Sequence, residues 1–336
     1  MKTLEFAKKI LEIPSPSGYT NNIINYLSSI CKEKGLDYHI TPKGNLIIEF
    51  AGENDYTLGL SAHVDTLGAM VKSIDSKGNL RFSVVGGPIL PTYDGEYCYI
   101  ITRENKVFTG TFLSNSPATH VYKDANTLPR NAETMHIRLD EKVSSKQEVL
   151  DLGITAGAFV VVEPKTVITK SNFIKSRFLD DKISVAILFS LIDHIVESKK
   201  KPKYNLKFII STYEEVGHGT TSIPSVDEMI AVDMGCIGED LSCTEHDVSI
   251  CVKDSFSPYD FNLTNELINL AKTNKLNYAV DVYPYYSSDV SAALRGGNDI
   301  KGALIGPGVS ASHGMERTHL DAVRNTLELL KSYINK

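Results

Sequence analysis

Two adjacent glutamates, Glu214 and Glu215, end a strongly apolar run in the stretch FIISTYEEVGHG at residues 208–219. Burying two ionised carboxylates in a strand costs free energy. Either the strand therefore leaves the core here, or the acids are placed at its end to do chemistry. At other places in the chain, residues of types that bind metals also follow an apolar run or stand at the start of a predicted helix. These are His63 with Asp65, Asp180 with Asp181, Asp233, and His313.

This set of donors is what a two-metal hydrolase requires. In such a site two divalent ions about 3.5–4 Å apart share one bridging carboxylate and polarise a water molecule. Each ion then has one histidine, one terminal carboxylate and the shared bridge, which leaves a position open for water or substrate. Mixed imidazole and carboxylate ligation suits zinc, and also cobalt or manganese. The sequence therefore predicts two divalent metal ions, with zinc favoured.

The adjacent glutamates have a role in the same chemistry. Successive side chains at a strand end point in different directions, so one glutamate can bind a metal while its neighbour takes a proton from the attacking water. The second glutamate can then pass that proton to the leaving amine, as general acid–base catalysis requires. Gly217 lets the backbone turn sharply beside them.

The elements that must position these residues alternate between helix and strand. The carboxyl ends of parallel strands are where α/β sheets place their sites, so this alternation predicts an α/β layered domain with the candidate residues at one edge. Apolar periodicity predicts helices over residues 3–13, 20–34, 180–200, 265–275 and 319–335, a hairpin over 38–50, and strands over 56–65, 205–215, 228–235 and 301–308.

A β-rich segment interrupts the alternation. Between about residues 69 and 164 the chain has short strand-like runs separated by turn signals, and its only helical signal is a short one over 144–153. This pattern is typical of a small barrel-like domain. The sequence therefore predicts a discontinuous catalytic domain over residues 1–68 and 165–336 and an inserted β-rich domain over 69–164.

Composition excludes several classes of partner. The chain of 336 residues carries 35 Lys and Arg against 41 Asp and Glu, a net charge of −6. This balance argues against nucleic acid and anionic membrane as partners. No apolar segment approaches the roughly 18 residues of a membrane span, and the N-terminus is an amphipathic helix with no secretory pattern. The five cysteines are scattered without a C-x-x-C motif, which predicts reduced thiols in a cytoplasmic protein.

The chain contains, in this order, the motifs AHVD, LDDK, EEVG, VDMG and SHGME. They resemble the motifs of the tetrahedral-type (TET) metallo-aminopeptidases. That family includes glutamyl aminopeptidases, deblocking aminopeptidases and so-called cellulase M. The flanking stretches IPSPSGYT, KGNLII and SSDVSAALRGG are similar too, so the resemblance covers nearly the whole chain. It implies a three-layer, phosphorylase/hydrolase-like α/β catalytic domain with a PDZ-like or barrel-like dimerisation domain. It also implies dimers that assemble into a dodecamer, whose inner cavity restricts substrates to short peptides.

Carried over residue by residue, the resemblance implies which side chains hold the two ions. His63 and Asp233 bind one ion, Glu215 and His313 bind the other, and Asp180 bridges both.

The resemblance also implies roles for three further carboxylates beside these metal ligands. Glu214 is the general base. Asp65 orients His63 through its other ring nitrogen. Asp181 supports the bridging loop and caps the following helix.

Several positions depart from the family pattern. Lys182 stands where the family has arginine. The residues after EEVG also differ from those of the family, and they include His218. His218 is either a loop histidine or a residue that shapes substrate specificity. His319 competes with His313 as a ligand, and we favour His313 because it follows a strand and a loop whereas His319 opens the last helix. Asp289 either contacts the amino group of the substrate or stiffens its loop.

These observations predict a metal-dependent aminopeptidase that hydrolyses N-terminal residues from short peptides, with Glu214 as general base. The same chemistry would serve an alternative, a di-metal amidase or deacylase acting on N-acylated amino acids or isopeptides. A catalytically inactive scaffold would have a broken ligand set, and every expected donor is present. A glucanase needs two carboxylates flanking a glycosidic bond without a metal, and nothing here supports that chemistry.

Overall fold

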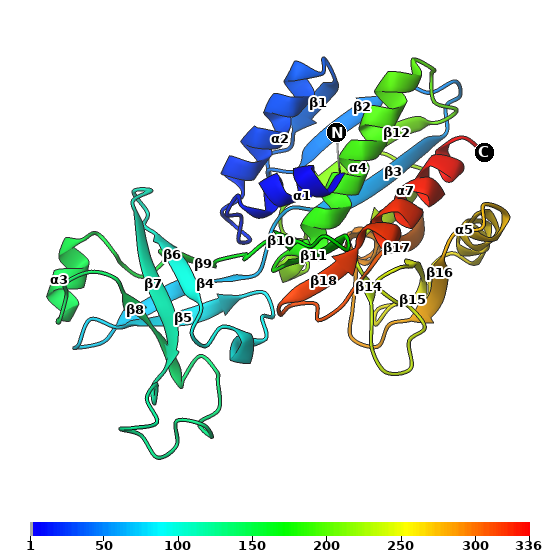
Figure 1. The fold of residues 1–336 in the computed structure, drawn as a ribbon. Coiled ribbons are helices and arrows are strands. Elements are labelled where there is room, and N and C mark those ends of the chain that lie inside the picture. The colour runs from blue at the N-terminus through cyan, green and yellow to red at the C-terminus, as the bar shows by residue number, and fades with distance from the viewer. Residues whose placement is uncertain (1–2) are drawn as a thin grey trace. The chain divides into compact units, whose positions relative to one another are not determined.

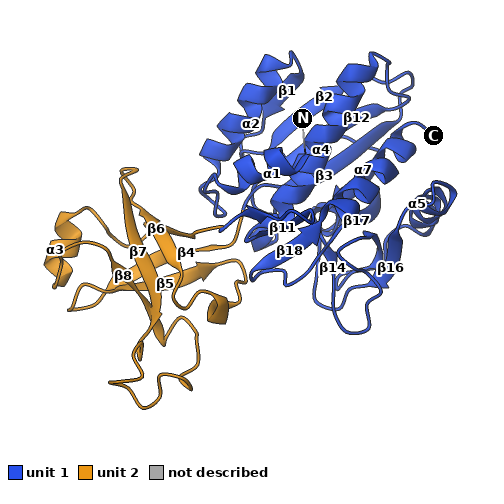
Figure 2. Cartoon of the chain, viewed as in Figure 1, with its two compact units in different colours: residues 1–65, 165–336 blue, residues 66–164 orange. Residues whose placement is uncertain are grey.

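The computed structural model describes residues 3–336, and the chain divides into two compact units (Figure 2). Unit 1 comprises residues 1–65 and 165–336, and unit 2 comprises residues 66–164. Unit 2 thus begins at residue 66, where the sequence analysis placed the boundary at 69, and it ends at 164. All the candidate metal-binding residues belong to unit 1.

Unit 1 is an α/β layered structure in which helices pack on a mixed sheet (Figure 1). Its helices are α1 (Thr3–Leu11), α2 (Asn21–Glu33), α4 (Leu179–Ser198), α5 (Phe261–Thr273), α6 (Asp289–Arg295) and α7 (Leu320–Ile334). Its main strands are β1 (Asp37–Ile40), β2 (Leu46–Phe50), β3 (Thr57–His63), β12 (Asn205–Ser211), β13 (Glu228–Val232), β14 (Gly235–Cys236), β15 (Val248–Lys253), β16 (Tyr278–Val282) and β17 (Lys301–Val309).

The order of strands in the main sheet is β1-β2-β12-β3-β13-β17-β15-β16, and β14 pairs with β17. Strands β12, β3, β13 and β17 are parallel neighbours at its centre, so their carboxyl ends lie at one edge. A second, three-stranded sheet is formed by β10 (Val167–Ile168), β11 (Phe173–Ser176) and β18 (Glu316–His319).

Helix α4 lies across the parallel strands in Figure 1, next to α1 and α7. The sequence predicts an apolar stripe on this helix, and the helix is in fact buried on nearly all sides from Leu179 to Leu188. Helices α1 and α7 cover the surface of α4 that the sheet leaves free. A helix that is buried all round is held by packing rather than by its amphipathic face.

Unit 2 is a closed barrel with its own core. Its strands are β4 (Gly68–Ile74), β5 (Leu80–Val85), β6 (Tyr97–Ile101), β7 (Val107–Ser114), β8 (Met135–Leu139) and β9 (Phe159–Val162), and its helix is α3 (Lys146–Asp151). They close in the order β4-β5-β8-β7-β6-β9, with β9 pairing back to β4. Buried side chains such as Phe82, Phe112 and Ile137 fill the interior. The predicted barrel-like insert is confirmed.

Most predicted elements are present, and two differences have a clear cause. Helix α5 begins at Phe261, earlier than predicted, because the Asp260 side chain caps it by accepting a 2.8 Å hydrogen bond from the Leu263 N–H. Helix α6 has only seven residues, too few to show a helical period, and the sequence analysis missed it. Within residues 3–336 no helix is long and apolar enough to cross a membrane.

Candidate metal centre

The candidate residues come together at the edge where the parallel strands end. His63 is the last residue of β3, and the short turn that carries Glu214 and Glu215 follows β12. Asp233 directly follows β13, and His313 lies in the loop after β17. Ser211 of β12 pairs with His63 in register, so these strands end at the same level. The sheet therefore brings five side chains from four strands to one place.

Asp180 and Asp181 reach this place from the start of α4. The helix begins irregularly, because neither residue has helical backbone angles. The Asp181 carboxylate accepts a 3.2 Å hydrogen bond from the backbone N–H of His63, which ties the helix start to the end of β3. Asp181 thus ties the start of α4 to the sheet, and its role as a cap of this helix stays a prediction.

Asp180 lies between the two histidines. Its Oδ1 is 3.1 Å from Nε2 of His63, and its Oδ2 is 3.6 Å from Nε2 of His313. Ser312 also donates a 3.0 Å hydrogen bond to Oδ2. Each carboxylate oxygen therefore faces a different imidazole, which is the arrangement expected of a carboxylate shared by two ions.

Each histidine also faces a second carboxylate. His63 Nε2 lies 3.9 Å from Oδ2 of Asp233, and His313 Nε2 lies 3.5 Å from Oε2 of Glu215. With Asp180 between them, these pairs form two adjacent groups of donors. Donor atoms of His63, Asp180 and Glu215, and of His63, Asp181 and Asp233, lie within 4.8 Å of one another, and these residue types suit a small divalent cation.

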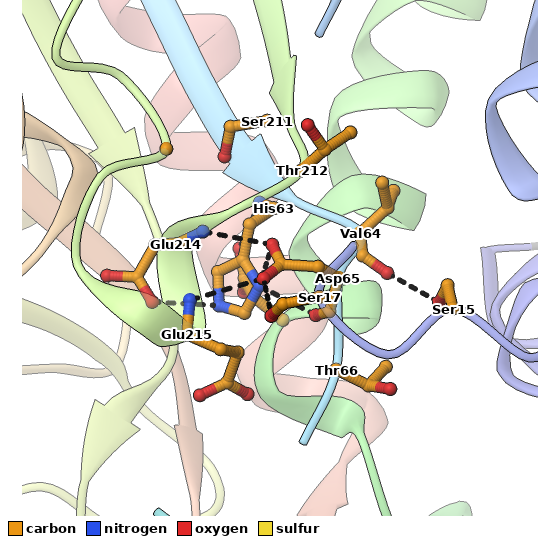
Figure 3. Close-up of polar contacts among 12 residues, drawn as sticks. Ser15, Ser17, His63, Val64, Asp65, Thr66, Ser211, Thr212, Glu214 and Glu215 are labelled. Carbon is orange, nitrogen blue, oxygen red and sulfur yellow. Dashed lines mark hydrogen bonds and ion pairs between the residues drawn. The ribbon is translucent and has the colours of Figure 1, made fainter. Parts of the chain in front are cut away.

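Asp65 holds the turn that carries Glu214 and Glu215 in place (Figure 3). Its carboxylate accepts hydrogen bonds from the backbone N–H groups of Glu214, at 3.1 Å, and Glu215, at 3.3 Å, and from the Ser17 hydroxyl. The group nearest to Nδ1 of His63 is the main-chain oxygen of Asp65, at 3.0 Å, while its carboxylate is 3.6 Å away. Asp65 therefore orients His63 through its carbonyl and the glutamate turn through its carboxylate.

The two glutamates differ in exposure. The side chain of Glu215 is 4% exposed and that of Glu214 is 15% exposed, although their backbones share Asp65 as acceptor. Glu214 Oε2 is also 3.7 Å from Nε2 of His63. Glu214 is thus the less buried member of the pair, and it too lies beside His63.

The carboxylates are buried and lie close together, and both effects shift their pKa values. Burial, with the charge of Asp180, raises the pKa of Glu215 well above its ordinary value. Burial also raises the pKa of Asp233 to about 7 and that of Glu214 well above its usual range. Burial alone would lower the pKa of His63, but the carboxylates of Asp180 and Glu214 raise it well above the ordinary value.

These residues fit a pair of divalent cations. A cation placed among them would favour the ionised carboxylates, which burial now disfavours. Glu215 Oε1 is buried and has no hydrogen-bond partner among the described residues, as expected of an oxygen reserved for a metal. The donor set therefore accounts for both the excess of buried acid and the unpaired oxygen.

His319 does not reach this centre. Its Nδ1 accepts a 3.0 Å hydrogen bond from the Asp321 N–H at the start of α7, and its Nε2 lies 2.9 Å from the Ser171 carbonyl oxygen. With His246 and Asp321 it forms a separate group of metal-binding residue types, in which both ring nitrogens of His319 and Nδ1 of His246 have partners. Of the two competing histidines, the structure places His313 at the centre.

Asp289 and Lys182 have partners within the fold. The Asp289 carboxylate accepts hydrogen bonds from the hydroxyls of Ser211, at 2.7 Å, and Thr220, at 3.1 Å, which agrees with the alternative that it stiffens its loop. The Lys182 ammonium is buried and donates a 2.7 Å hydrogen bond to the Ile13 carbonyl, and burial lowers its pKa to about 7. Lys182 thus anchors the segment after α1.

His218 is exposed and stacks on Tyr213, with ring centroids 4.9 Å apart and an interplanar angle of 20°. The ammonium of Lys43 lies 5.7 Å from the centroid of the same Tyr213 ring. The stacked rings of half-buried Tyr213 and exposed His218 flank the turn that carries Glu214 and Glu215, and both alternatives for His218 stay predictions.

Two residues at or near the centre, Glu316 and Tyr286, are not predicted from the sequence. Glu316 is buried, and its carboxylate accepts hydrogen bonds of 3.0 Å from the backbone N–H groups of both Asp180 and His313. Tyr286, in the loop after β16, has a buried hydroxyl, and burial together with the charge of Asp233 raises its pKa well above the ordinary value. The motif SHGME contains Glu316, but only its distance from Asp180 in space reveals its role.

The family model described as M42 glutamyl aminopeptidase matches residues 44–329. The Bacillus subtilis (strain 168) protein named "Putative aminopeptidase YhfE" is 46% identical over 336 residues, which cover 99% of this chain and 97% of that protein.

Solved structures share the fold. The Pyrococcus horikoshii TET1 peptidase, described as assembling into a tetrahedron or a large octahedral shell, matches with a TM-score of 0.86 at 23% identity and covers 100% of both chains. The dodecamer named PhTET1-12s matches with a TM-score of 0.87 at 23% identity, again over 100% of both chains.

Proposed function

The chain belongs to the M42 glutamyl aminopeptidase family, and from that membership we propose that it is a metal-dependent aminopeptidase that removes N-terminal residues from short peptides. The observation that carries this proposal is the position of Asp180, with one carboxylate oxygen toward His63 and the other toward His313. A carboxylate with one oxygen toward each of two imidazoles is the arrangement that a bridging ligand of a two-metal hydrolase would have.

Five residues would hold two ions. His63 and Asp233 would bind one, Glu215 and His313 the other, and Asp180 would bridge them. When bound, the ions would act as Lewis acids on the peptide carbonyl and increase the acidity of water. Zinc suits these donors best, and cobalt or manganese would also fit.

Glu214 would move the proton. Its carboxylate would take a proton from the water as the oxygen bonds to the carbonyl carbon of the first residue. It would then give that proton to the amide nitrogen as the C–N bond breaks, which releases a free amino acid and a shortened peptide. Asp65 would keep the glutamate in position, because it accepts hydrogen bonds from the backbone of the turn.

We further propose that the chain works as a dimer-based homo-oligomer, up to a dodecamer, with peptides as its substrates. Structures of the same fold include a dodecamer and a tetrahedral assembly. The acidic net charge of −6 disfavours nucleic acid as a partner. All five cysteines are free, which is consistent with a cytoplasmic location.

The test is hydrolysis of free and N-acetylated short peptides by the wild type and Glu214→Gln, each stripped and reloaded with zinc, cobalt or manganese. We expect metal-restored release of N-terminal residues by the wild type. In Glu214→Gln, kcat should fall by a factor of about 100 to 10,000 with metal content unchanged. Glu239→Gln, at an exposed glutamate, is the matched control. Hydrolysis of acetylated substrates alone would replace the aminopeptidase by the amidase.

A further inference from the structure

The segment after α1 contains the stretch PSPSG at residues 14–18, to which the proposed mechanism gives no role. Its two serines are buried, and both contact the residues that directly follow β3 (Figure 3). The Ser15 hydroxyl donates a 2.7 Å hydrogen bond to the Val64 carbonyl oxygen. The Ser17 hydroxyl donates a 2.5 Å hydrogen bond to Oδ2 of Asp65. One serine thus holds the backbone of this stretch, and the other holds a carboxylate.

A tight turn sets the position of Ser17. The Tyr19 N–H donates a 2.7 Å hydrogen bond to the Pro16 carbonyl oxygen, and Gly18 has a φ of 93°. Serine therefore occupies the second position of a β-turn, and glycine occupies the third, where a positive φ favours it. The backbone of this turn directs the Ser17 hydroxyl toward Asp65.

Asp65 connects Ser17 to the proposed base. Its carboxylate is buried and accepts the backbone N–H of Glu214 at Oδ1, at 3.1 Å, and that of Glu215 at Oδ2, at 3.3 Å. Oδ2 is also the oxygen that accepts the Ser17 hydroxyl. Loss of a hydrogen bond to a buried charged group is costly, and the carboxylate would then be free to rotate. The Ser17 hydroxyl therefore fixes the acceptor on which the glutamate turn rests.

We propose that Ser17 is a positioning residue, whose hydroxyl holds the Asp65 carboxylate and thereby keeps Glu214 where it can take the proton from the attacking water. This inference rests on the proposed function, which makes Glu214 the base. In this role Ser17 touches neither the substrate nor the ions, and no proton passes along the chain of hydrogen bonds. Its loss should therefore affect the chemical step and not substrate binding.

The kinetic test is Ser17→Ala at saturating zinc. Loss of a supporting partner in a metal site typically costs 10–100-fold in activity, so we expect kcat to fall by a factor of about 10 to 100 with KM nearly unchanged. Ser17→Thr keeps a hydroxyl group and should regain most of this loss. Ser15→Ala is the matched control, because this buried serine of the same segment bonds to a carbonyl oxygen and not to Asp65.

A double-mutant cycle shows whether Ser17 acts through the base. Residues that act as one unit have effects that do not add, so Ser17→Ala should lower the kcat of Glu214→Gln by less than about threefold.

Hydrogen exchange tests the same inference without any activity. Mass spectrometry of a peptide that spans residues 212–217 reports on the N–H groups of Glu214 and Glu215. In Ser17→Ala these groups should exchange about tenfold faster or more, because their shared acceptor is less firmly held. In Ser15→Ala they should exchange at the wild-type rate.

Three outcomes would overturn the inference. The first is that Ser17→Ala matches Ser15→Ala in both kcat and exchange. The second is an undiminished loss of kcat in the Glu214→Gln background, because Ser17 would then act on another group. The third is a Ser17→Thr variant no more active than Ser17→Ala. A wild type that hydrolyses no peptide would end the proposed function, and exchange would still decide whether Ser17 holds the turn.

Discussion

One buried carboxylate organises two of the proposed ligands. Glu316 accepts the backbone N–H groups of Asp180 and His313 with its two oxygens, each at 3.0 Å. His313 has a φ of 65°, a left-handed conformation that is uncommon for residues other than glycine. A hydrogen bond on its N–H helps to hold this conformation. Glu316 therefore fixes the backbone of the bridging residue relative to that of the late histidine.

Glu316→Gln should weaken metal binding. The amide group would place its NH2 against one of the two backbone N–H donors, so one hydrogen bond is lost and the ligands separate. Removal of supporting partners around metal ligands typically costs 10–100-fold in affinity, and we expect a loss of about that size. Competition with a chromophoric chelator would measure it. Glu239→Gln is the control, and an unchanged affinity in Glu316→Gln would show that the ligands need no such support.

At the scale of elements, the sequence predicted where strands end, but it did not predict which distant segments contact one another. The apolar runs before His63, Glu214 and Asp233 predicted three strand ends, and the parallel sheet places them together. The sequence could not show Tyr286 or Glu316 at the centre. Neither follows an apolar run that ends at the site, and their roles depend on neighbours over 100 residues away or on the orientation of a loop.

Close contact between strands also limits substitution. A Cβ atom on Gly306, in β17, would lie 1.7 Å from the Asp233 carbonyl oxygen, and Asp233 donates its own N–H to Ile305 at 2.9 Å. The strand and the proposed ligand can pair in this way only because residue 306 has no side chain. This requirement belongs to the packing of β17 against the end of β13.

Gly306→Ala should therefore destabilise the fold and displace Asp233. Overpacking of a rigid site costs about 1–3 kcal/mol or more, and here the obstacle is backbone, which cannot rotate away. We expect a lower midpoint of thermal unfolding together with weaker metal binding. Gly238→Ala, where a Cβ would contact nothing within 4 Å, is the matched control. Equal stability of both variants would contradict this packing argument.

For the whole molecule, the metal ions should contribute to stability. Burial and mutual repulsion raise the pKa values of Glu214, Glu215 and Asp233, so this centre is costly to fold with its carboxylates ionised and no cation. An ion that binds only the folded state stabilises it by about 2.7 kcal/mol at 100 times its Kd. Chelation should lower the midpoint of unfolding and zinc should restore it. In Asp180→Asn the shift on adding zinc should be much smaller, and an equal shift would place the stabilising ion elsewhere.

The inserted barrel should set the assembly state and not the fold of the catalytic unit. Each unit has its own buried core, and the chain enters and leaves the barrel on β4 and β9, where Ala69 pairs with Val160 in antiparallel register. Because the two ends of the insert leave on neighbouring strands, a short Gly-Ser linker can replace residues 67–163. The barrel carries exposed apolar side chains, among them Tyr97 and Val107, at 60% and 59%.

We expect the variant without the insert to remain folded and to bind metal, but to have a much lower mass than the full chain in size-exclusion chromatography with light scattering. Exposed apolar groups on a closed barrel gain stability when a second copy covers them, whereas the barrel needs no partner to complete its own hydrogen bonding. A matched control is the full chain with Gly238→Ala, which should keep its assembly state. If the shortened chain assembled to the same number of subunits, the contacts between copies would lie on the catalytic unit, and the barrel would need another role.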